Sequence, residues 1–195
     1  MGLLITPSES EKTTLPSQLY ESTVLATAIA DDGSAFTIVA GLTEAIAADL
    51  KRHSLDESDV ELMKSTSDKR RFGEGSFETW FKKERYAFAL VDGDALAALI
   101  WFGPEEMPHE FQSEHYVLGT HDTLGFRSYE PYRGKRLMTD FSRFVIDAYA
   151  RMRPGRTLWL QTNTDNGAAI RLYQKLGFIE KGVGTDNGRL VMVQP

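Results

Sequence analysis

Two passages from strand to helix in the second half of the 195-residue chain limit the fold more than any other feature. Residues 123–129 (TLGFRSY) favour a β-strand, and apolar residues recur at helical spacing over 137–150. After a Pro-Gly break, a buried-strand pattern returns over 157–162 (TLWLQT), and a second amphipathic helix follows as far as Leu176. Strands that alternate with helices in this way predict an α/β fold.

A β-hairpin is expected just before these passages. Residues 86–91 (YAFALV) and 95–102 (ALAALIWF) are apolar, β-capable runs, and an acidic turn with a Gly separates them. Further β-prone runs lie at 36–40 (FTIVA) and 189–193 (RLVMV). A hairpin next to two strand-to-helix passages predicts a sheet of mixed direction.

The first part of the chain carries weaker patterns. Residues 1–30 are expected to form a flexible or surface-packed N-terminal extension, within which 19–30 fits either a short helix or a strand. Residues 31–195 have the size of a single domain. Within them the charged run 56–71 predicts a solvated helix, and Ser76 is the expected N-cap of another.

Composition excludes several classes of protein. The chain has no Cys, which excludes a disulfide framework and a cysteine nucleophile, and its four His residues show no shared metal-ligand spacing. A net charge of −6 argues against nucleic acid, whose binders present basic surfaces. No segment approaches the roughly 20 apolar residues of a membrane span, and no signal peptide is visible, so a cytoplasmic protein is expected.

The first passage, residues 126–140 (FRSYEPYRGKRLMTD), carries three cations where the helix starts. They are Arg133, Lys135 and Arg136. A helix N-terminus offers unpaired backbone N–H groups and a partial positive charge, which suit a phosphate or pyrophosphate. The turn alone fits a solvated basic turn as well.

The second passage places Asn166 where the strand gives way to the helix, and Tyr173 two turns further along, near the same face. Gly177 then ends the helix. Taken alone, these residues describe a helix cap and a partly buried core tyrosine.

Together the two passages resemble the GNAT superfamily of N-acetyltransferases. That family's pattern is a strand, a turn of the form [Q/R]-x-x-G-x-[G/A] and a helix, followed by a second strand and the motif N-x-x-A-x-x-x-Y-x-x-x-G-F. Residues 86–193 are similar to this pattern. The turn begins at Arg133, and the second motif matches at Asn166, Ala169, Tyr173, Gly177 and Phe178. The resemblance implies a mixed, mostly antiparallel sheet flanked by helices, with splayed central strands.

The resemblance also implies an N-acetyltransferase that uses acetyl-CoA and no metal. A primary amine of a small molecule or protein would attack the thioester directly. The pantetheine arm would pair with the strand near Phe126 and Ser128, and Asn166 and Tyr173 would also contact CoA. The pyrophosphate would lie on the turn formed by Arg133, Gly134, Lys135, Arg136 and Leu137.

Two proton-transfer roles follow from the resemblance. Tyr173 matches the family's general acid, which donates to the departing CoA thiolate. For the general base, the region before and beside the turn offers His121, Asp122 and Glu130; Asp122 ranks first, and water is the alternative. Arg127 is expected to bind either an acidic group on the acceptor or a salt-bridge partner within the sheet.

The turn departs from the family's pattern at two positions. Arg136 and Met138 stand where members usually carry Gly or another small residue that lets the backbone approach the pyrophosphate. A catalytically weak or inactive CoA-binding protein of the same fold, with a regulatory or interaction role, is therefore the alternative function. The sequence leaves open the acceptor, the acyl length and the oligomeric state, with a homodimer as one option. The loop over 103–119 fits a lid or a surface insertion.

Overall fold

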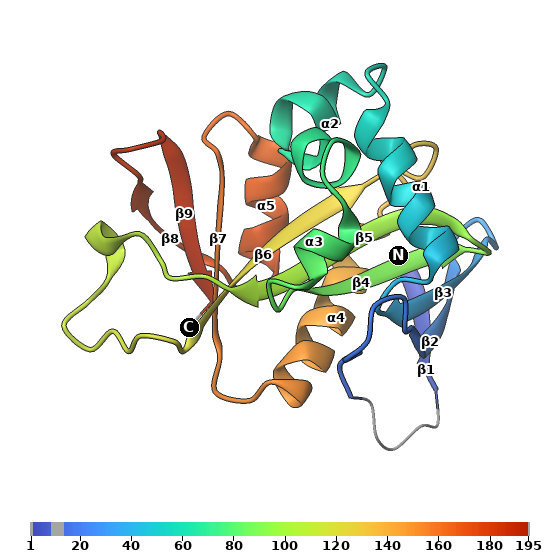
Figure 1. Ribbon diagram of the computed structural model, residues 1–195, viewed down its shortest axis with the longest axis horizontal. Coiled ribbons are helices and arrows are strands. Elements are labelled where there is room, and N and C mark those ends of the chain that lie inside the picture. Colours follow the sequence, from blue (N-terminus) through green and yellow to red (C-terminus); the bar gives the residue numbers. More distant parts are fainter. Residues whose placement is uncertain (1, 9–13, 195) are drawn as a thin grey trace.

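The chain forms a nine-stranded sheet in a computed structural model that describes residues 2–8 and 14–194 (Figure 1). The strands lie in the order β1-β2-β3-β4-β5-β6-β7-β9-β8. Neighbours run antiparallel except β6 and β7, which are parallel. The strands are β1 (Leu3–Pro7), β2 (Thr23–Ala30), β3 (Ala35–Ala40), β4 (Tyr86–Asp92), β5 (Ala95–Pro104), β6 (His121–Ser128), β7 (Thr157–Asn163), β8 (Ile179–Val183) and β9 (Arg189–Gln194).

Helices cover both faces of the sheet, which confirms the predicted fold class. One face carries α1 (Glu44–Leu55), α2 (Val60–Ser65), a π-helical turn over Lys69–Gly73 and α3 (Phe77–Phe81). The other face carries α4 (Met138–Met152) and α5 (Gly167–Lys175). None of the helices in the described residues is long and apolar enough to cross a membrane.

Side-chain alternation along β5 divides the hydrophobic core between these two layers. Phe102 packs toward α4, where its ring stacks on that of Tyr149 with centroids 4.0 Å apart. Its neighbour Trp101 points to the opposite face and meets the edge of Trp80 at 5.9 Å. The two central strands of the predicted hairpin are therefore buried on both sides.

Several predicted elements are present where their patterns placed them. The hairpin forms β4 and β5, and the two passages form β6 with α4 and β7 with α5. Ser76 caps α3 and Asn166 caps α5, because each side chain accepts a hydrogen bond of 3.1 Å from a backbone N–H three residues later. Gly177 follows α5 with a φ of 88°, a conformation that glycine adopts without strain.

The N-terminal segment contributes strands to the sheet, and over 23–30 the strand is the alternative that occurs. Residues 3–7 and 23–30 form β1 and β2, which extend the sheet instead of lying outside the domain. In β2 the buried positions include Ala26, Ala28 and Ala30, whose small side chains produce only a weak apolar alternation. Residues 1 and 9–13 of the predicted extension lie outside the described residues.

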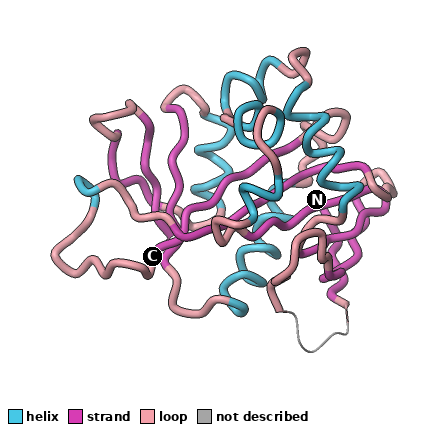
Figure 2. The backbone as a smooth tube through the Cα atoms, viewed as in Figure 1, coloured by secondary structure: helices cyan, strands magenta, loops and turns pink. Residues whose placement is uncertain are grey.

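Two other segments also differ. The predicted helix over 56–71 is interrupted: α2 ends at Ser65, Thr66 is extended, and the π-helical turn begins only at Lys69. The strand β8 was not predicted, because its side chains are mostly exposed and lack an apolar alternation. The loop between β5 and β6 is confirmed as a long connection with one 3-10 turn, and it lies beside β8 and β9 (Figure 2).

The strands β6 and β7 form a fork. They pair only where His121–Thr123 meets Thr157–Trp159, and they diverge beyond these three residue pairs (Figure 1). On its other edge β6 is paired with β5 along its whole length. The predicted splaying of the central strands is therefore confirmed, and it leaves an unpaired strand edge inside the molecule.

Candidate active site

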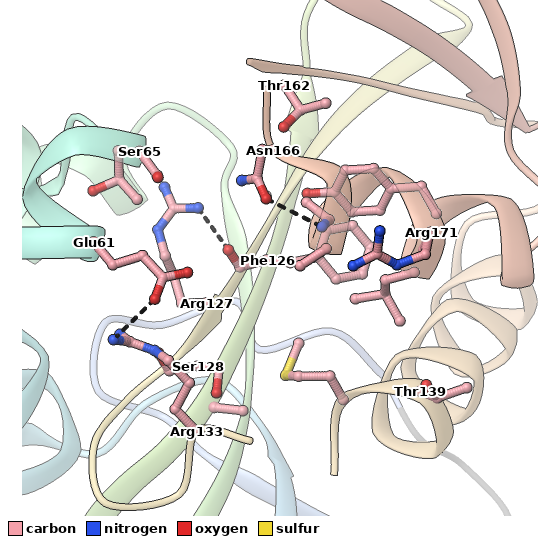
Figure 3. A pocket seen from close by; sticks show the side chains of 18 of the residues that line it. Glu61, Ser65, Phe126, Arg127, Ser128, Arg133, Thr139, Thr162, Asn166 and Arg171 are labelled. Carbon is pink, nitrogen blue, oxygen red and sulfur yellow. Dashed lines mark hydrogen bonds and ion pairs between the residues drawn. The ribbon is translucent and has the colours of Figure 1, made fainter. Parts of the chain in front are cut away.

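The fork opens a cleft of about 660 Å³. Strands β6 and β7 and helices α2 and α5 form its walls, and the turn that leads into α4 closes one end. Figure 3 shows Asn166 and Arg171 on the α5 side, Glu61 and Ser65 on the α2 side, and Phe126 of β6 between them. The cleft therefore brings together the two sequence passages that carry the family resemblance.

The β6 edge that faces the cleft presents backbone groups without a neighbouring strand. Guanidinium groups occupy two of its carbonyl oxygens: Arg127 donates to that of Phe126 at 2.7 Å, and Arg133 to that of Ser128 at 2.9 Å. Each carbonyl oxygen has a second lone pair, and an open strand edge readily pairs with an extended ligand. Phe126 and Ser128 thus lie where an extended arm can bind.

The turn before α4 has a backbone suited to an anion. Among the described residues no side chain caps α4 at Leu137, so none of them satisfies the first N–H groups of this helix as a cap would. Gly134 and Arg136 both have positive φ, 80° and 61°. A left-handed backbone favours Gly over residues with a Cβ, which accounts for the small residue that the family pattern has at Arg136.

The side chains of this turn do not act as one cationic group. Arg133 bonds to both carboxylate oxygens of Asp59 at 2.7 and 3.0 Å, and these bonds raise the pKa of Arg133. Lys135 lies 3.9 Å from the carboxylate of Asp32 and does not line the cleft. Arg136 lines the cleft and has no ion-pair partner within the described residues.

Two cations absent from the predicted set accompany Arg136. Arg171 and Lys175 lie one helical turn apart on α5 and line the same cleft. In the described part of the chain neither has a carboxylate partner. Their four-residue spacing on the helix that follows Asn166 is the sequence signal that indicates a shared face.

Tyr173 lines the cleft with a hydroxyl that makes no hydrogen bond to the described protein groups. Its side chain is buried, and its ring packs against Phe126 with centroids 5.0 Å apart. Burial raises the pKa of Tyr173 to about 12, although Arg127 and Arg189 act in the opposite direction. The hydroxyl is therefore protonated at neutral pH and able to donate a proton.

A buried ion cluster supports the α2 side of the fork. Asp68 is fully buried and accepts hydrogen bonds from Arg127 at 2.5 and 2.8 Å and from Arg71 at 3.0 Å. Burial opposes ionisation of this carboxyl, but the two guanidinium groups outweigh it and lower the pKa of Asp68. The predicted salt bridge of Arg127 exists, with a partner in the helical layer instead of the sheet. Sequence reasoning missed Asp68, which lies in a run expected to be solvated.

The structure does not bring the three candidate bases into the cleft. Asp122 is fully buried at the paired end of the fork, where Tyr149 donates to it at 2.7 Å and Arg156 at 2.5 and 2.8 Å. His121 stacks on a tyrosine ring, and Glu130 is 64% exposed beside an arginine. Asp122 lies before the strands separate, so its hydrogen bonds hold together the paired end of the fork.

No group of three His, Asp or Glu side chains that could hold a metal occurs in the described ranges.

A family model described as an acetyltransferase (GNAT) domain matches residues 34–179, well over half of the chain. A search of curated protein sequences gives no significant match.

Solved structures share the fold at low sequence identity. Mycobacterium smegmatis RimJ in complex with CoA-disulfide has a TM-score of 0.60 and 11% identity, over 80% of this chain and 81% of that one. Spermidine N-acetyltransferase from Vibrio cholerae, in complex with CoA and spermine, has a TM-score of 0.57 and 15% identity, over 82% of this chain and 95% of that one. The GNAT domain of S. lividans PAT has a TM-score of 0.56 and 17% identity, over 88% of this chain and 95% of that one. The extent of the family match, together with this shared fold, shows that the chain belongs to the GNAT family of acetyltransferases.

Proposed function

We propose that this protein transfers the acetyl group of acetyl-CoA to the nitrogen of a primary amine. One observation carries the proposal: a free strand edge, an uncapped helix start and the Tyr173 hydroxyl line one continuous cleft. Structures of the same fold are described as a spermidine N-acetyltransferase and a ribosomal L7/L12 α-N-protein acetyltransferase. Amine acetylation is the activity that these titles share.

The residues of the cleft fit a CoA thioester. The amides of the pantetheine arm would pair with β6 near Phe126 and Ser128, and the pyrophosphate would accept hydrogen bonds from the uncapped start of α4. Arg136, Arg171 and Lys175 would offset the charge of the phosphates, because no carboxylate of the described chain holds these side chains. Asn166 and Tyr173 line the space between this turn and β7.

The proposed reaction needs no nucleophile from the protein. The amine nitrogen bonds to the acetyl carbon, the carbon–sulfur bond breaks, and a backbone N–H of β6 stabilises the charge that develops on the carbonyl oxygen. Tyr173 donates its proton to the departing sulfur, which its high pKa of about 12 allows at neutral pH. The proton that the nitrogen loses returns through water to the tyrosinate, so the protons balance.

We assign deprotonation of the incoming ammonium to water. A primary amine is mostly protonated at neutral pH and must lose a proton before it attacks. Among the described residues that line the cleft, Glu61 is the one carboxylate, and it is 67% exposed and 3.6 Å from Arg133. Asp122 lies outside the cleft and does not enter the proposed mechanism.

Replacing Tyr173 by Phe tests the proposal most directly. The variant loses the proton donor and keeps the ring, so we expect kcat to fall by about 10²- to 10⁴-fold while calorimetric binding of acetyl-CoA stays within about twofold. Thiol release from acetyl-CoA with a panel of amines measures kcat. Tyr20→Phe, which removes a hydroxyl outside the cleft, is the matched control.

The same experiment separates the alternative function. A protein that binds CoA without transferring its acetyl group would show calorimetric binding and no amine-dependent thiol release from the unaltered chain. Full turnover by Tyr173→Phe under conditions limited by chemistry would remove Tyr173 from the mechanism and leave acetyl transfer itself in place.

A further inference from the structure

The cleft is basic although the protein as a whole is acidic. Among the described residues that line it, one side chain is acidic and six are cationic, whereas the chain carries a net charge of −6. The acidic residue is Glu61, and the cationic ones are Arg127, Arg133, Arg136, Arg171, Lys175 and Arg189. A concentration of one sign of charge in a cleft favours ligands of the opposite sign.

Five of these six cations already have an assignment. Two are held by the carboxylates of Asp68 and Asp59. Three lie at the turn before α4 or on α5, where the proposed function places the phosphates of CoA. The sixth, Arg189, belongs to neither group.

Arg189 lies on the face of the sheet opposite to α5. Along β9, Leu190 and Met192 pack into the core under α4 and α5, whereas Val191 and Val193 belong to the cluster on the other face. Successive side chains of a strand alternate between faces, so Arg189 shares the face of Val191. This is the face of the sheet that carries α2, opposite to the α5 side on which the proposed function places the phosphates of CoA.

The guanidinium of Arg189 is largely free. Its Nε donates to Asn163 at 3.2 Å, and its two terminal nitrogens make no hydrogen bond to the described protein groups. In contrast, all three nitrogens of Arg127 are engaged by Asp68 or by the carbonyl of Phe126. Two parallel N–H groups on a planar guanidinium match the two oxygens of a carboxylate.

Arg189 shares the cleft with the proposed proton donor. Arg189 and Tyr173 line the same cleft, and the charge of Arg189, like that of Arg127, acts to lower the pKa of the Tyr173 hydroxyl. A small molecule whose amine reaches the thioester beside Tyr173 can therefore present a second group to Arg189.

The cleft offers little to a polycationic acceptor. Glu61 is mostly exposed and lies 3.6 Å from Arg133, and Asp165, which precedes the cleft residue Asn166, is 67% exposed and paired with Lys64 at 3.3 Å. Binding a polyamine requires acidic groups placed opposite its several charges, since like charges facing each other cost affinity.

We infer that the acceptor is a small amine that also carries a carboxylate, as an amino acid does, and that Arg189 binds this carboxylate. The inference rests on the proposed acetyl transfer and names its substrate class. It makes Arg189 a specificity-determining residue whose loss weakens binding of acceptors that carry a carboxylate more than binding of those that lack one.

The test compares L-amino acids with their carboxamides and with spermidine in an assay for thiol release from acetyl-CoA. We expect kcat/KM for the acids to exceed that for the amides by at least about tenfold in the unaltered protein. Arg189→Gln should raise KM for the acids about tenfold or more and change KM for the amides much less, whereas any change in kcat through Tyr173 should be shared by both acceptors. Arg189→Glu should reverse the preference.

The control variant is Lys181→Gln, which removes one positive charge from an exposed position on β8 and should keep the tenfold preference. Amides or spermidine acetylated better than the acids would overturn the inference and leave acetyl transfer standing. Calorimetric binding of acetyl-CoA with no thiol release for any amine would overturn the proposed function and the inference together.

Discussion

Two fully buried carboxylates beside β6, Asp68 and Asp122, show how the fork is built. Each is held by an arginine, Asp68 by Arg127 and Asp122 by Arg156, whose side chains are 12% and 14% exposed. Asp122 belongs to the part of β6 that is paired with β7. Asp68 belongs to the helical layer and holds Arg127 where the strands have already separated.

The same pairing therefore has two consequences. At the paired end, Asp122 links β6 to α4 through Tyr149 and to the start of β7 through Arg156, which keeps the fork closed. At the open end, Asp68 orients Arg127, whose guanidinium satisfies the carbonyl of Phe126 in place of a neighbouring strand. Asp122, predicted as the base, thus lies at the closed end of the fork and outside the cleft, whereas Asp68, from the charged run, holds an arginine that lines the cleft.

The largest expected effect comes from removing either carboxylate. Asp68→Ala leaves Arg71 and Arg127 without their buried partner, so we expect the free energy of unfolding to fall by about 3–5 kcal/mol, measured by urea denaturation. Asp122→Ala should cost a comparable amount through Arg156.

Kinetics then separate the two sites. Among variants that still fold, Asp68→Asn should raise KM for the amine acceptor several-fold, because it loosens the wall on the α2 side. Asp122→Asn, at the closed end, should leave that KM within about twofold. A stability loss below about 1 kcal/mol for Asp68→Ala, or equal changes in KM, would contradict the distinction.

Lowering the pH should remove part of the stability that Asp68 contributes to the fold. The folded state lowers the pKa of Asp68, so this carboxyl binds a proton less readily when folded than when unfolded. Its stabilisation is complete above the unfolded value of about 4 and is lost as pH falls through the lower folded pKa. The pKa of Asp59 is lowered by its hydrogen bond to Arg133, so the stability that Asp59 contributes is also lost as the pH falls.

Urea denaturation at about pH 6 and about pH 3 measures this loss. We expect Asp68→Asn to show a smaller decrease in unfolding free energy between the two pH values than the unaltered protein. An equal decrease in both proteins would mean that Asp68 is not a source of the acid sensitivity.

The smallest effect should come from the exposed ion pair that joins α2 to the segment before α5. Lys64 and Asp165 are 70% and 67% exposed, so water and salt screen them. We expect Lys64→Gln to change the free energy of unfolding by less than about 0.5 kcal/mol, measured by urea denaturation. A double-mutant cycle with Asp165→Asn that gave more than about 1.5 kcal/mol of coupling would contradict the contrast with the buried pairs.

Local patterns were sufficient for the elements around the fork. The hairpin, α4, β7 and α5 have clear patterns of apolar residues. Ser76 and Asn166 act as caps through hydrogen bonds to residues only three positions later. Such features depend on neighbouring residues, which a sequence shows directly.

Local patterns were insufficient at the edges of the sheet and within the charged run. The strands β1 and β8 gain their pairing from partners elsewhere in the chain, and their own alternation is weak. The run over 56–71 was expected to be solvated, yet it supplies the buried Asp68. Whether a charged residue is buried depends on an arginine 59 positions away, which no local pattern contains.

The sequence by itself determined the order of strands and helices from β4 to α5, the family resemblance and the presence of Asn166 and Tyr173 on one helix. Only the tertiary structure decided the role of each charge, because pairing depends on which distant segments meet. It joined Arg133 to Asp59 and Arg127 to Asp68, placed Asp122 outside the cleft, and left Arg189 free to face it.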